Sequence, residues 1–242
     1  MRYDLMVTGY PAVAAYDNDA VRGLFEPMLR CWARHGTGER RIIFLAGPPG
    51  AGKSTLAAFL ERHAQDMQDM PPVQALSMDG FHYPQAYIES HTVMRNGEMI
   101  PMRRVKGAPD TFDADALRQR LWRLKKEDVS WPVYDRRLHD VVPDAVRVHA
   151  PILIVEGNYL LLDAPIWREL PHDETVFLRA EEGMLRKRLI ARKMRGGMTE
   201  EAALRFYEEC DGPNVRLCLT RSLPAETTFT VGENGAILPD AK

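Results

Sequence analysis

The segment GPPGAGKST, residues 47–55, contains the residues whose types and spacing most clearly suit a chemical task. It matches the pattern G-x-x-x-x-G-K-[ST] and directly follows the apolar run RIIFLA, which we expect to be a strand. Glycines let the backbone curl so that successive N–H groups point at phosphate oxygens, and the start of the next helix adds its positive dipole end. Lys53 is expected to contact the β- and γ-phosphates, and Ser54 to ligate Mg²⁺. We therefore predict a nucleoside triphosphate site formed by Gly47, Pro48, Pro49, Gly50, Ala51, Gly52, Lys53, Ser54 and Thr55.

Asp79 is a second candidate for chemistry, because it ends the strand-like run VQALSM and is followed by Gly80. One interpretation is a turn, since Asp-Gly is a common turn pair. The other is an acid that faces a ligand, because ligand sites in parallel sheets lie at the carboxyl ends of the strands. The phosphate loop also follows a strand, so we predict that both segments face one crevice. Asp79 would then accept the proton of an attacking hydroxyl as a general base.

Glu156 closes the buried run ILIVEG in the same way. An acid at the end of such a strand can hold the hydration shell of a bound Mg²⁺ or a bound water. The alternative is an acid at the edge of the core that pairs with a backbone amide. With the phosphate loop present, we predict that Glu156 takes part in metal binding together with Ser54.

The stretch EEGMLRKRLIARKMRGG contains a basic helical face, on which Arg188, Arg192 and Arg195 recur at helix spacing. Most basic helix faces are simply solvated. Phosphoryl transfer, however, requires positive charge that neutralises the transferred group. Gly196 and Gly197 offer a hinge, so we predict a closing lid whose arginines act on the transferred group.

The composition excludes several classes of protein. The chain has 242 residues and a formal net charge of -2, which gives no reason to expect attraction to nucleic acid or to a membrane surface. Its three cysteines show no metal-ligand spacing and read as reduced thiols. No apolar run is long enough to cross a bilayer, and the first residues lack the apolar core of a signal peptide. We expect a cytoplasmic protein.

Apolar strands alternate with helical patterns, which is typical of a parallel sheet covered by helices on both faces. We predict an α/β fold of three layers, with strands at 41–46, 73–78, 152–157 and 175–180. Helical patterns begin at Asp17, with Gly36 as a stop signal, at Asp113, a good N-cap, and at Thr199, which caps a helix over about 200–220. The segment 79–112 is too long for an idle connection and is expected to be functional. The chain is predicted to form one domain with an N-terminal hairpin and helix (1–40), a core (41–222) with its lid (about 181–197), and closing strands (223–242) that turn at Asn234-Gly235.

Five segments together resemble one branch of the P-loop kinases, that of uridine kinase, pantothenate kinase and phosphoribulokinase. They are GPPGAGKST, SMDGFHYP, KGAPDTFD, WPVYDRRLHD and LIVEGNYLLL, and the resemblance covers most of residues 40–222. The chain is most similar to a bacterial subgroup of nucleoside/nucleotide kinase-like or fructose-transport-system kinase proteins. The resemblance implies a P-loop fold, ATP and Mg²⁺ as cofactors, and Asp79 as the base. It also implies Arg188 and Arg192 as catalytic lid contacts.

The resemblance also implies where an acceptor binds. PVYDRRLHD is similar to the uridine kinase element P-x-Y-D-x-x-x-H, whose tyrosine and histidine contact the base. The chain departs from that element at Arg136 and Val141, which suggests a more polar or anionic acceptor. DGPNVRLC is similar to a segment of the subgroup in which an asparagine approaches the acceptor. The expected acceptor-binding residues are Phe81, Tyr83, Lys106, Tyr134, Arg136, His139 and Asn214.

Several alternatives remain open from the sequence. The chain could instead be a nucleotide-dependent switch or slow NTPase that uses residues 79–112 as a partner surface. Within the kinases, an already phosphorylated sugar could be the acceptor, clamped by Arg103, Arg104 and Lys106. The lack of a guanine-specificity element N-K-x-D favours ATP over GTP. A homodimer through the N-terminal hairpin and helix is possible.

Overall fold

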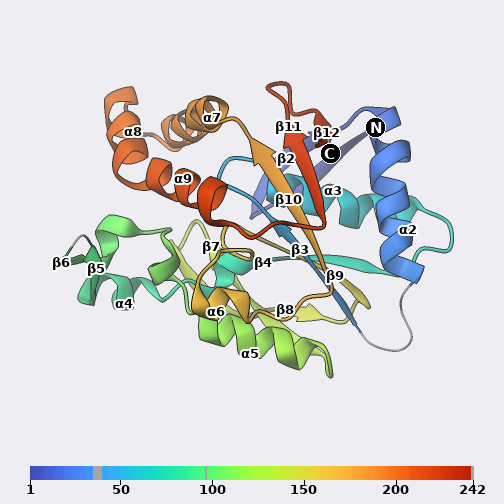
Figure 1. The fold of residues 1–242 in the computed structure, drawn as a ribbon, viewed down its shortest axis with the longest axis horizontal. Helices are drawn as coiled ribbons and strands as arrows, with labels where there is room; N and C mark the ends of the chain where they lie inside the picture. Colours follow the sequence, from blue (N-terminus) through green and yellow to red (C-terminus); the bar gives the residue numbers. More distant parts are fainter. Residues whose placement is uncertain (35–39, 96, 241–242) are drawn as a thin grey trace.

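The computed structural model describes residues 1–34, 40–95 and 97–240. Among these residues, six strands form the central sheet in the order β12-β11-β10-β3-β9-β4 (Figure 1). Neighbouring strands are parallel, except for the antiparallel pair β11 and β12. The predicted α/β architecture with a mainly parallel sheet is therefore confirmed. The strands are β3 (Arg41–Ala46), β4 (Val73–Ser77), β9 (Ile152–Gly157), β10 (Glu174–Ala180), β11 (Thr227–Val231) and β12 (Ile237–Pro239).

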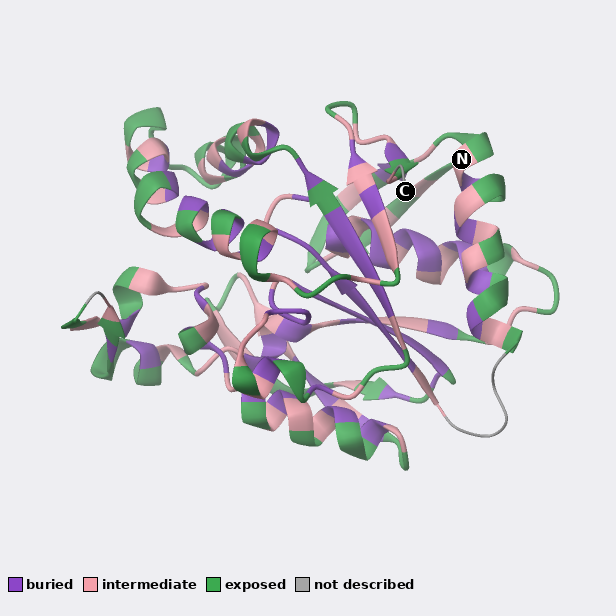
Figure 2. Ribbon diagram, in the orientation of Figure 1, coloured by how far each residue is buried: buried purple, intermediate pink, exposed green. Residues whose placement is uncertain are grey.

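Helices cover both faces of this sheet because its strands are apolar on both sides. Along β3, Ile43 and Leu45 pack into one core, whereas Ile42 and Phe44 pack into the other. The first core also receives residues of α2 (Glu26–Arg34), α3 (Lys53–Asp66) and α7 (Glu182–Arg195), and the second those of α5 (Ala114–Leu124) and α6 (Pro165–Arg168). The central strands β3, β9 and β10 are buried along nearly their whole length (Figure 2). Each fully buried aliphatic or aromatic side chain contributes roughly 1.5–3 kcal/mol.

The helix boundaries follow the capping residues. The Asp113 side chain accepts a hydrogen bond from Ala116 N (2.9 Å) at the start of α5. Thr199 likewise accepts one from Ala202 N (3.3 Å) and begins α8 (Glu200–Phe206). A π-helical turn (Tyr207–Asp211) then leads into α9 (Gly212–Arg221). The helix predicted over 200–220 is thus present, with an inserted π turn of the kind often found at functional sites.

The N-terminal hairpin consists of β1 (Arg2–Val7) and β2 (Tyr10–Ala15). Thr8 and Gly9 both have positive φ (49° and 83°), as in the two-residue turns that suit the twist of a hairpin. A short α1 (Asn18–Ala20) and a π turn (Val21–Phe25) precede α2. The glycine that the sequence suggests as the end of α2, Gly36, lies outside the described residues. At the other end, the predicted turn at Asn234-Gly235 does join β11 to β12.

Two hairpins and a short helix were not expected from the sequence. β7 (Val129–Asp135) pairs with β8 (Asp140–Val148), with an irregularity between Trp131 and Val133. Within 79–112, α4 (Gln85–Ser90) is followed by the hairpin of β5 (Thr92–Arg95) and β6 (Glu98–Pro101). Pro132 and the charged residues 135–137 break the alternation that marks a strand in a sequence. In the described part of the chain, no helix has the length and apolar character needed to cross a membrane.

Candidate active site

The phosphate loop joins β3 to α3 and is held close to the neighbouring strand. Gly47 has φ 151°, and a Cβ at this position would lie 2.5 Å from the carbonyl oxygen of Leu178 on β10. Lys53 is 6% exposed, and its Nζ donates to the carbonyl oxygen of Pro48 (3.0 Å) and to Oδ1 of Asn158 (2.8 Å). Burial lowers the pKa of Lys53, and the carboxylate of Glu156 acts in the opposite direction. Both partners of the ammonium are neutral, so it can turn toward phosphate oxygens without breaking an ion pair.

Asp79 is brought to the same end of the sheet by strand register. Ser77 lies opposite Glu156, which in turn lies opposite Leu45 at the end of β3. The chain then makes a short 3₁₀ turn (Met78–Phe81) in which Asp79 N donates to Ser77 Oγ (3.2 Å). The Asp79 carboxylate lies 3.4 Å from Nη2 of Arg136, at the end of β7.

The glycine after Asp79 is required by close packing and not by the conformation of the turn. A Cβ on Gly80 would lie 2.0 Å from the carbonyl oxygen of Pro132 on β7. Only glycine allows the 78–81 turn to approach the β7 backbone this closely. The Asp-Gly pair therefore marks a tight contact between β7 and the turn that carries Asp79.

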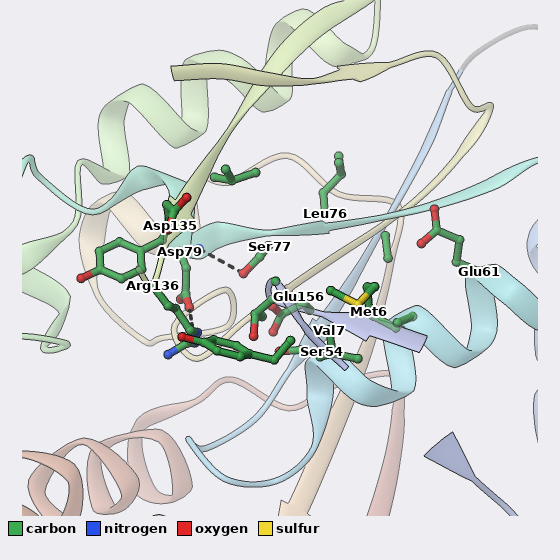
Figure 3. A pocket seen from close by; sticks show the side chains of 18 of the residues that line it. Met6, Val7, Ser54, Glu61, Leu76, Ser77, Asp79, Asp135, Arg136 and Glu156 are labelled. Atoms are coloured by element: carbon green, nitrogen blue, oxygen red, sulfur yellow. Dashed lines mark hydrogen bonds and ion pairs between the residues drawn. The ribbon is translucent and has the colours of Figure 1, made fainter. Parts of the chain in front are cut away.

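Glu156 is the most deeply buried carboxylate of the site, with 5% exposure. The hydroxyls of Ser77 and Ser54 donate hydrogen bonds to it. Burial raises the pKa of Glu156, and the charge of Asp79 raises it further. Ser54, Glu156 and Asp79 all line one cavity of about 470 Å³, in which the Asp79 carboxylate points toward Arg136 (Figure 3).

The oxygen atoms at this point suit a magnesium ion that arrives with a nucleotide. Mg²⁺ usually binds through one or two carboxylates plus substrate phosphates, rather than in an all-protein cage. Within the described ranges, no group of three or more His, Cys, Asp and Glu side chains is placed to hold a metal ion. Ser54 and Glu156 supply a hydroxyl and a carboxylate, so the residues present fit the expected ion.

The comparisons with known proteins agree with this geometry. The family model described as the phosphoribulokinase / uridine kinase family matches residues 42–223, which include every site residue described so far. The chain belongs to the phosphoribulokinase/uridine kinase family. It is an ATP-dependent kinase whose acceptor is a hydroxyl group.

Its relatives extend over most of the chain. YggC of Escherichia coli strain K12, a protein described as uncharacterized, is 40% identical over 240 residues, or 97% of this chain and 98% of that protein. A Schizosaccharomyces pombe protein, named as a proposed uridine kinase, is 35% identical over 186 residues, or 73% and 77%. The crystal structure of a proposed fructose transport system kinase from Silicibacter sp. TM1040 superposes with a TM-score of 0.74 at 32% identity, and covers 86% of this chain and 98% of that one.

Arg188 and Arg192, the two arginines predicted to act from a lid, lie in different places. Arg188 donates to the carbonyl oxygens of Gly50 in the phosphate loop (3.4 Å) and of Gly232 (3.1 Å) and Glu233 (3.3 Å) in the turn after β11. Arg192, one turn further along α7, lies 4.0 Å from Oδ2 of Asp211. Burial lowers the pKa of Arg192, and the charges of Asp211 and Asp79 act in the opposite direction. Arg188 therefore contacts the phosphate loop, whereas Arg192 lies beside Asp211.

Tyr134 and Arg136 are the expected acceptor residues that line the cavity of the kinase, whereas Lys106 and Asn214 are not part of its lining. Nζ of Lys106 lies 5.2 Å from the centroid of the Tyr134 ring and donates to Oε1 of Gln85 (2.5 Å). Asn214 is buried on α9, and a Cβ added to Gly107 would meet its side-chain nitrogen at 3.5 Å.

Three other expected residues do not line this cavity. Phe81 is 5% exposed and packs edge-on against Trp131, with ring centroids 4.8 Å apart. Tyr83 stacks on Tyr87 (4.4 Å) and packs against the small core around Ile88. His139 is exposed in the β7–β8 turn, where its φ is 54°. Aromatic residues beside a catalytic acid look like ligand contacts in a sequence, but here the turn directs Phe81 inward.

The sequence interpretation also missed residues of the site. Asn158, which holds Lys53, follows directly after Gly157, and a polar residue at the end of a buried strand was an available signal. Glu61 on α3 and the hairpin tip Met6–Tyr10 line the cavity as well. Nothing in their local sequence marks them, because they reach the cavity through packing between distant segments.

Proposed function

We propose that this kinase transfers the γ-phosphate of ATP, with Mg²⁺, to a hydroxyl of a small sugar, nucleoside or pantothenate-like acceptor. The observation that carries the proposal is the convergence of Ser54, Glu156 and Asp79 on one cavity at the carboxyl ends of β3, β4 and β9. A cavity of about 470 Å³ is in the range of small-ligand sites.

Each residue has a role that follows from its position. The acceptor oxygen attacks the γ-phosphorus, the bond to the β–γ bridging oxygen breaks, and the acceptor proton passes to Asp79. Lys53 and the loop N–H groups hold the phosphates, and Ser54 and Glu156 would hold the magnesium ion, which supplies charge neutralisation. Arg192 contributes positive charge from the lid, while closure excludes water that would otherwise accept the phosphoryl group.

An already phosphorylated acceptor is not favoured by the geometry. Its proposed clamp consists of Arg103, Arg104 and Lys106, none of which lines the cavity. Arg103 and Arg104 are exposed on the turn Met102–Val105, and Lys106 is engaged by Gln85. The interpretation as a switch is not favoured either, because a carboxylate, Asp79, and an acceptor-sized cavity lie beside Ser54 at the end of the phosphate loop.

The test is an assay of the purified protein with ATP, Mg²⁺ and a panel of sugars, polyols, nucleosides and pantothenate. ADP formation is followed together with mass spectrometry of the products. We expect one acceptor class to raise ADP formation and to yield a phosphorylated product in equal amount. ADP release that is the same with and without every panel member would contradict the proposal.

A further inference from the structure

The cavity has a wall that lies outside the family-matched segment. The family model matches residues 42–223, yet the tip of the N-terminal hairpin, Met6–Tyr10, lines the same cavity as Ser54 and Asp79. In Figure 3, Met6 and Val7 lie beside Ser54, on the side toward Glu61. One side of the cavity is therefore formed by the hairpin, which lies outside the family-matched residues 42–223.

The hairpin is anchored to the helix that carries Ser54. Tyr3 on β1 donates to Oδ2 of Asp66 (2.6 Å), and its hydroxyl lies 3.1 Å from Nδ1 of His63, both on α3. After β2, the Tyr16 ring packs edge-on against Phe59 of α3, with centroids 4.7 Å apart. These contacts fix the tip relative to the catalytic residues, as a specificity wall requires.

The charges that line the cavity are unequal. Its lining residues carry four carboxyl groups (Glu61, Asp79, Asp135 and Glu156) and two guanidinium groups (Arg136 and Arg137). Asp79 and Arg136 offset each other at 3.4 Å, and the Asp135 carboxylate accepts hydrogen bonds from Arg137 N and Leu138 N, which leaves Glu61 and Glu156 against Arg137. The lining also includes the apolar Val7, Ala57 and Val133. Such a surface repels an added negative charge and accommodates a neutral molecule.

We propose that the hairpin tip forms one wall of the acceptor site. The cavity that it completes selects an uncharged alcohol over the carboxylated or phosphorylated counterpart of that alcohol. The proposal rests on the kinase function proposed above and narrows it to neutral polyols, sugars or nucleoside-like alcohols. The acceptor hydroxyl lies at the Asp79 end, and the remainder of the molecule extends between α3 and the hairpin.

Matched acceptor pairs that differ only in charge test the selection. Suitable pairs are glycerol and glycerate, pantothenol and pantothenate, fructose and a fructose phosphate, and uridine and its monophosphate. We expect the neutral member of the productive pair to have the higher kcat/KM, by about tenfold or more. Glu61→Gln removes one carboxyl from the cavity and should reduce that ratio. A preference for the anionic member would overturn the charge argument.

Variants on one hairpin test the wall itself. Tyr10→Ala removes a ring from the cavity, whereas Val13→Ala removes an exposed side chain from the same strand outside it. We expect Tyr10→Ala to raise the acceptor KM about tenfold with the ATP KM unchanged, and Val13→Ala to behave as wild type. Met6→Ala is the second cavity variant if Tyr10→Ala unfolds, which circular dichroism would show.

The outcomes separate this inference from the function on which it rests. If no panel member becomes phosphorylated, the proposed function fails and the hairpin assignment fails with it. If wild type phosphorylates an acceptor but Tyr10→Ala and Met6→Ala match Val13→Ala, the hairpin assignment alone is overturned. A rise in the acceptor KM confined to the cavity variants supports both.

Discussion

The two halves of the site are built in different ways. The proposed nucleotide half is nearly continuous in sequence, since residues 47–55 carry the phosphate-binding motif and Asn158 and Arg188 add hydrogen bonds to it from elsewhere. The proposed acceptor half is assembled from the hairpin tip, α3, the end of β4, the end of β7 and Glu156. The first half can be recognised from one motif, whereas the second depends on how distant segments pack.

Phosphate binding therefore depends on local structure, whereas specificity for the acceptor depends on contacts between distant segments. Binding of phosphates needs backbone N–H groups, a lysine and a helix start, all within one turn of the chain. Selection of an acceptor depends on the shape of the cavity, and the hairpin and β7 form opposite sides of that cavity. Variants on each half should therefore affect the two substrates separately.

The largest effect is expected on the nucleotide half, from Lys53→Met. The buried ammonium is the charge closest to the phosphate loop, and its loss should lower kcat/KM by about a thousandfold. Lys126→Met, at an exposed position after α5, is the matched control and should retain activity. Steady-state kinetics checks both variants, and a loss of less than about tenfold for Lys53→Met would contradict the assignment.

A smaller effect is expected from Arg188→Ala. Because Arg188 bridges Gly50 and the turn at Gly232, its removal should raise the KM for ATP by about tenfold and leave the acceptor KM unchanged. Lys187→Ala, at the neighbouring solvent-facing position, serves as the control. If the acceptor KM rose as much as the ATP KM, this result would contradict the proposed separation of the two halves.

The smallest expected effect is on the free energy of unfolding. Whether the variant raises or lowers this free energy is the informative result. Burial and the charge of Asp79 raise the pKa of Glu156, so the ionised form costs stability at neutral pH. Glu156→Gln should raise the free energy of unfolding of the nucleotide-free protein by on the order of 1 kcal/mol, while activity is lost.

The pH dependence of that gain provides its check. A carboxyl whose folded pKa is raised costs most stability above that pKa; the cost shrinks as the pH falls below it and disappears only below the pKa of the unfolded chain. Urea unfolding of both proteins at about pH 7 and about pH 5 should show a smaller gain at the lower pH. A glutamine variant that is less stable at neutral pH would show that Glu156 stabilises the fold through its hydrogen bonds with Ser54 and Ser77.

The sequence predicted the parts of the molecule whose structure is set locally. The buried strands, the capped helices at Asp113 and Thr199, and the loop around Lys53 follow from apolar runs, side-chain caps and glycine spacing. The juxtaposition of Asp79 with Ser54 was also predictable, because parallel strands present their carboxyl ends at one edge.

The features that the sequence did not predict are those set by packing between distant segments. The direction of the Phe81 ring depends on the contact between Gly80 and Pro132, which the sequence alone does not show. The hairpin tip reaches the cavity because Tyr3 and Tyr16 dock on α3, a contact between residues about 40–60 positions apart. His139 was placed by motif analogy, but the β7–β8 turn carries it into solvent.

The central claim is that the two halves meet at Asp79, and Asp79→Asn tests it most directly. The variant keeps the shape of the side chain but cannot accept the proton, so turnover with the acceptor should fall at least about a hundredfold. Affinity for ATP, measured by calorimetry with Mg²⁺, should stay within about twofold of wild type, because Asp79 lies on the acceptor side. Turnover that remains within a few-fold of wild type, or loss of ATP affinity in parallel with turnover, would contradict the account.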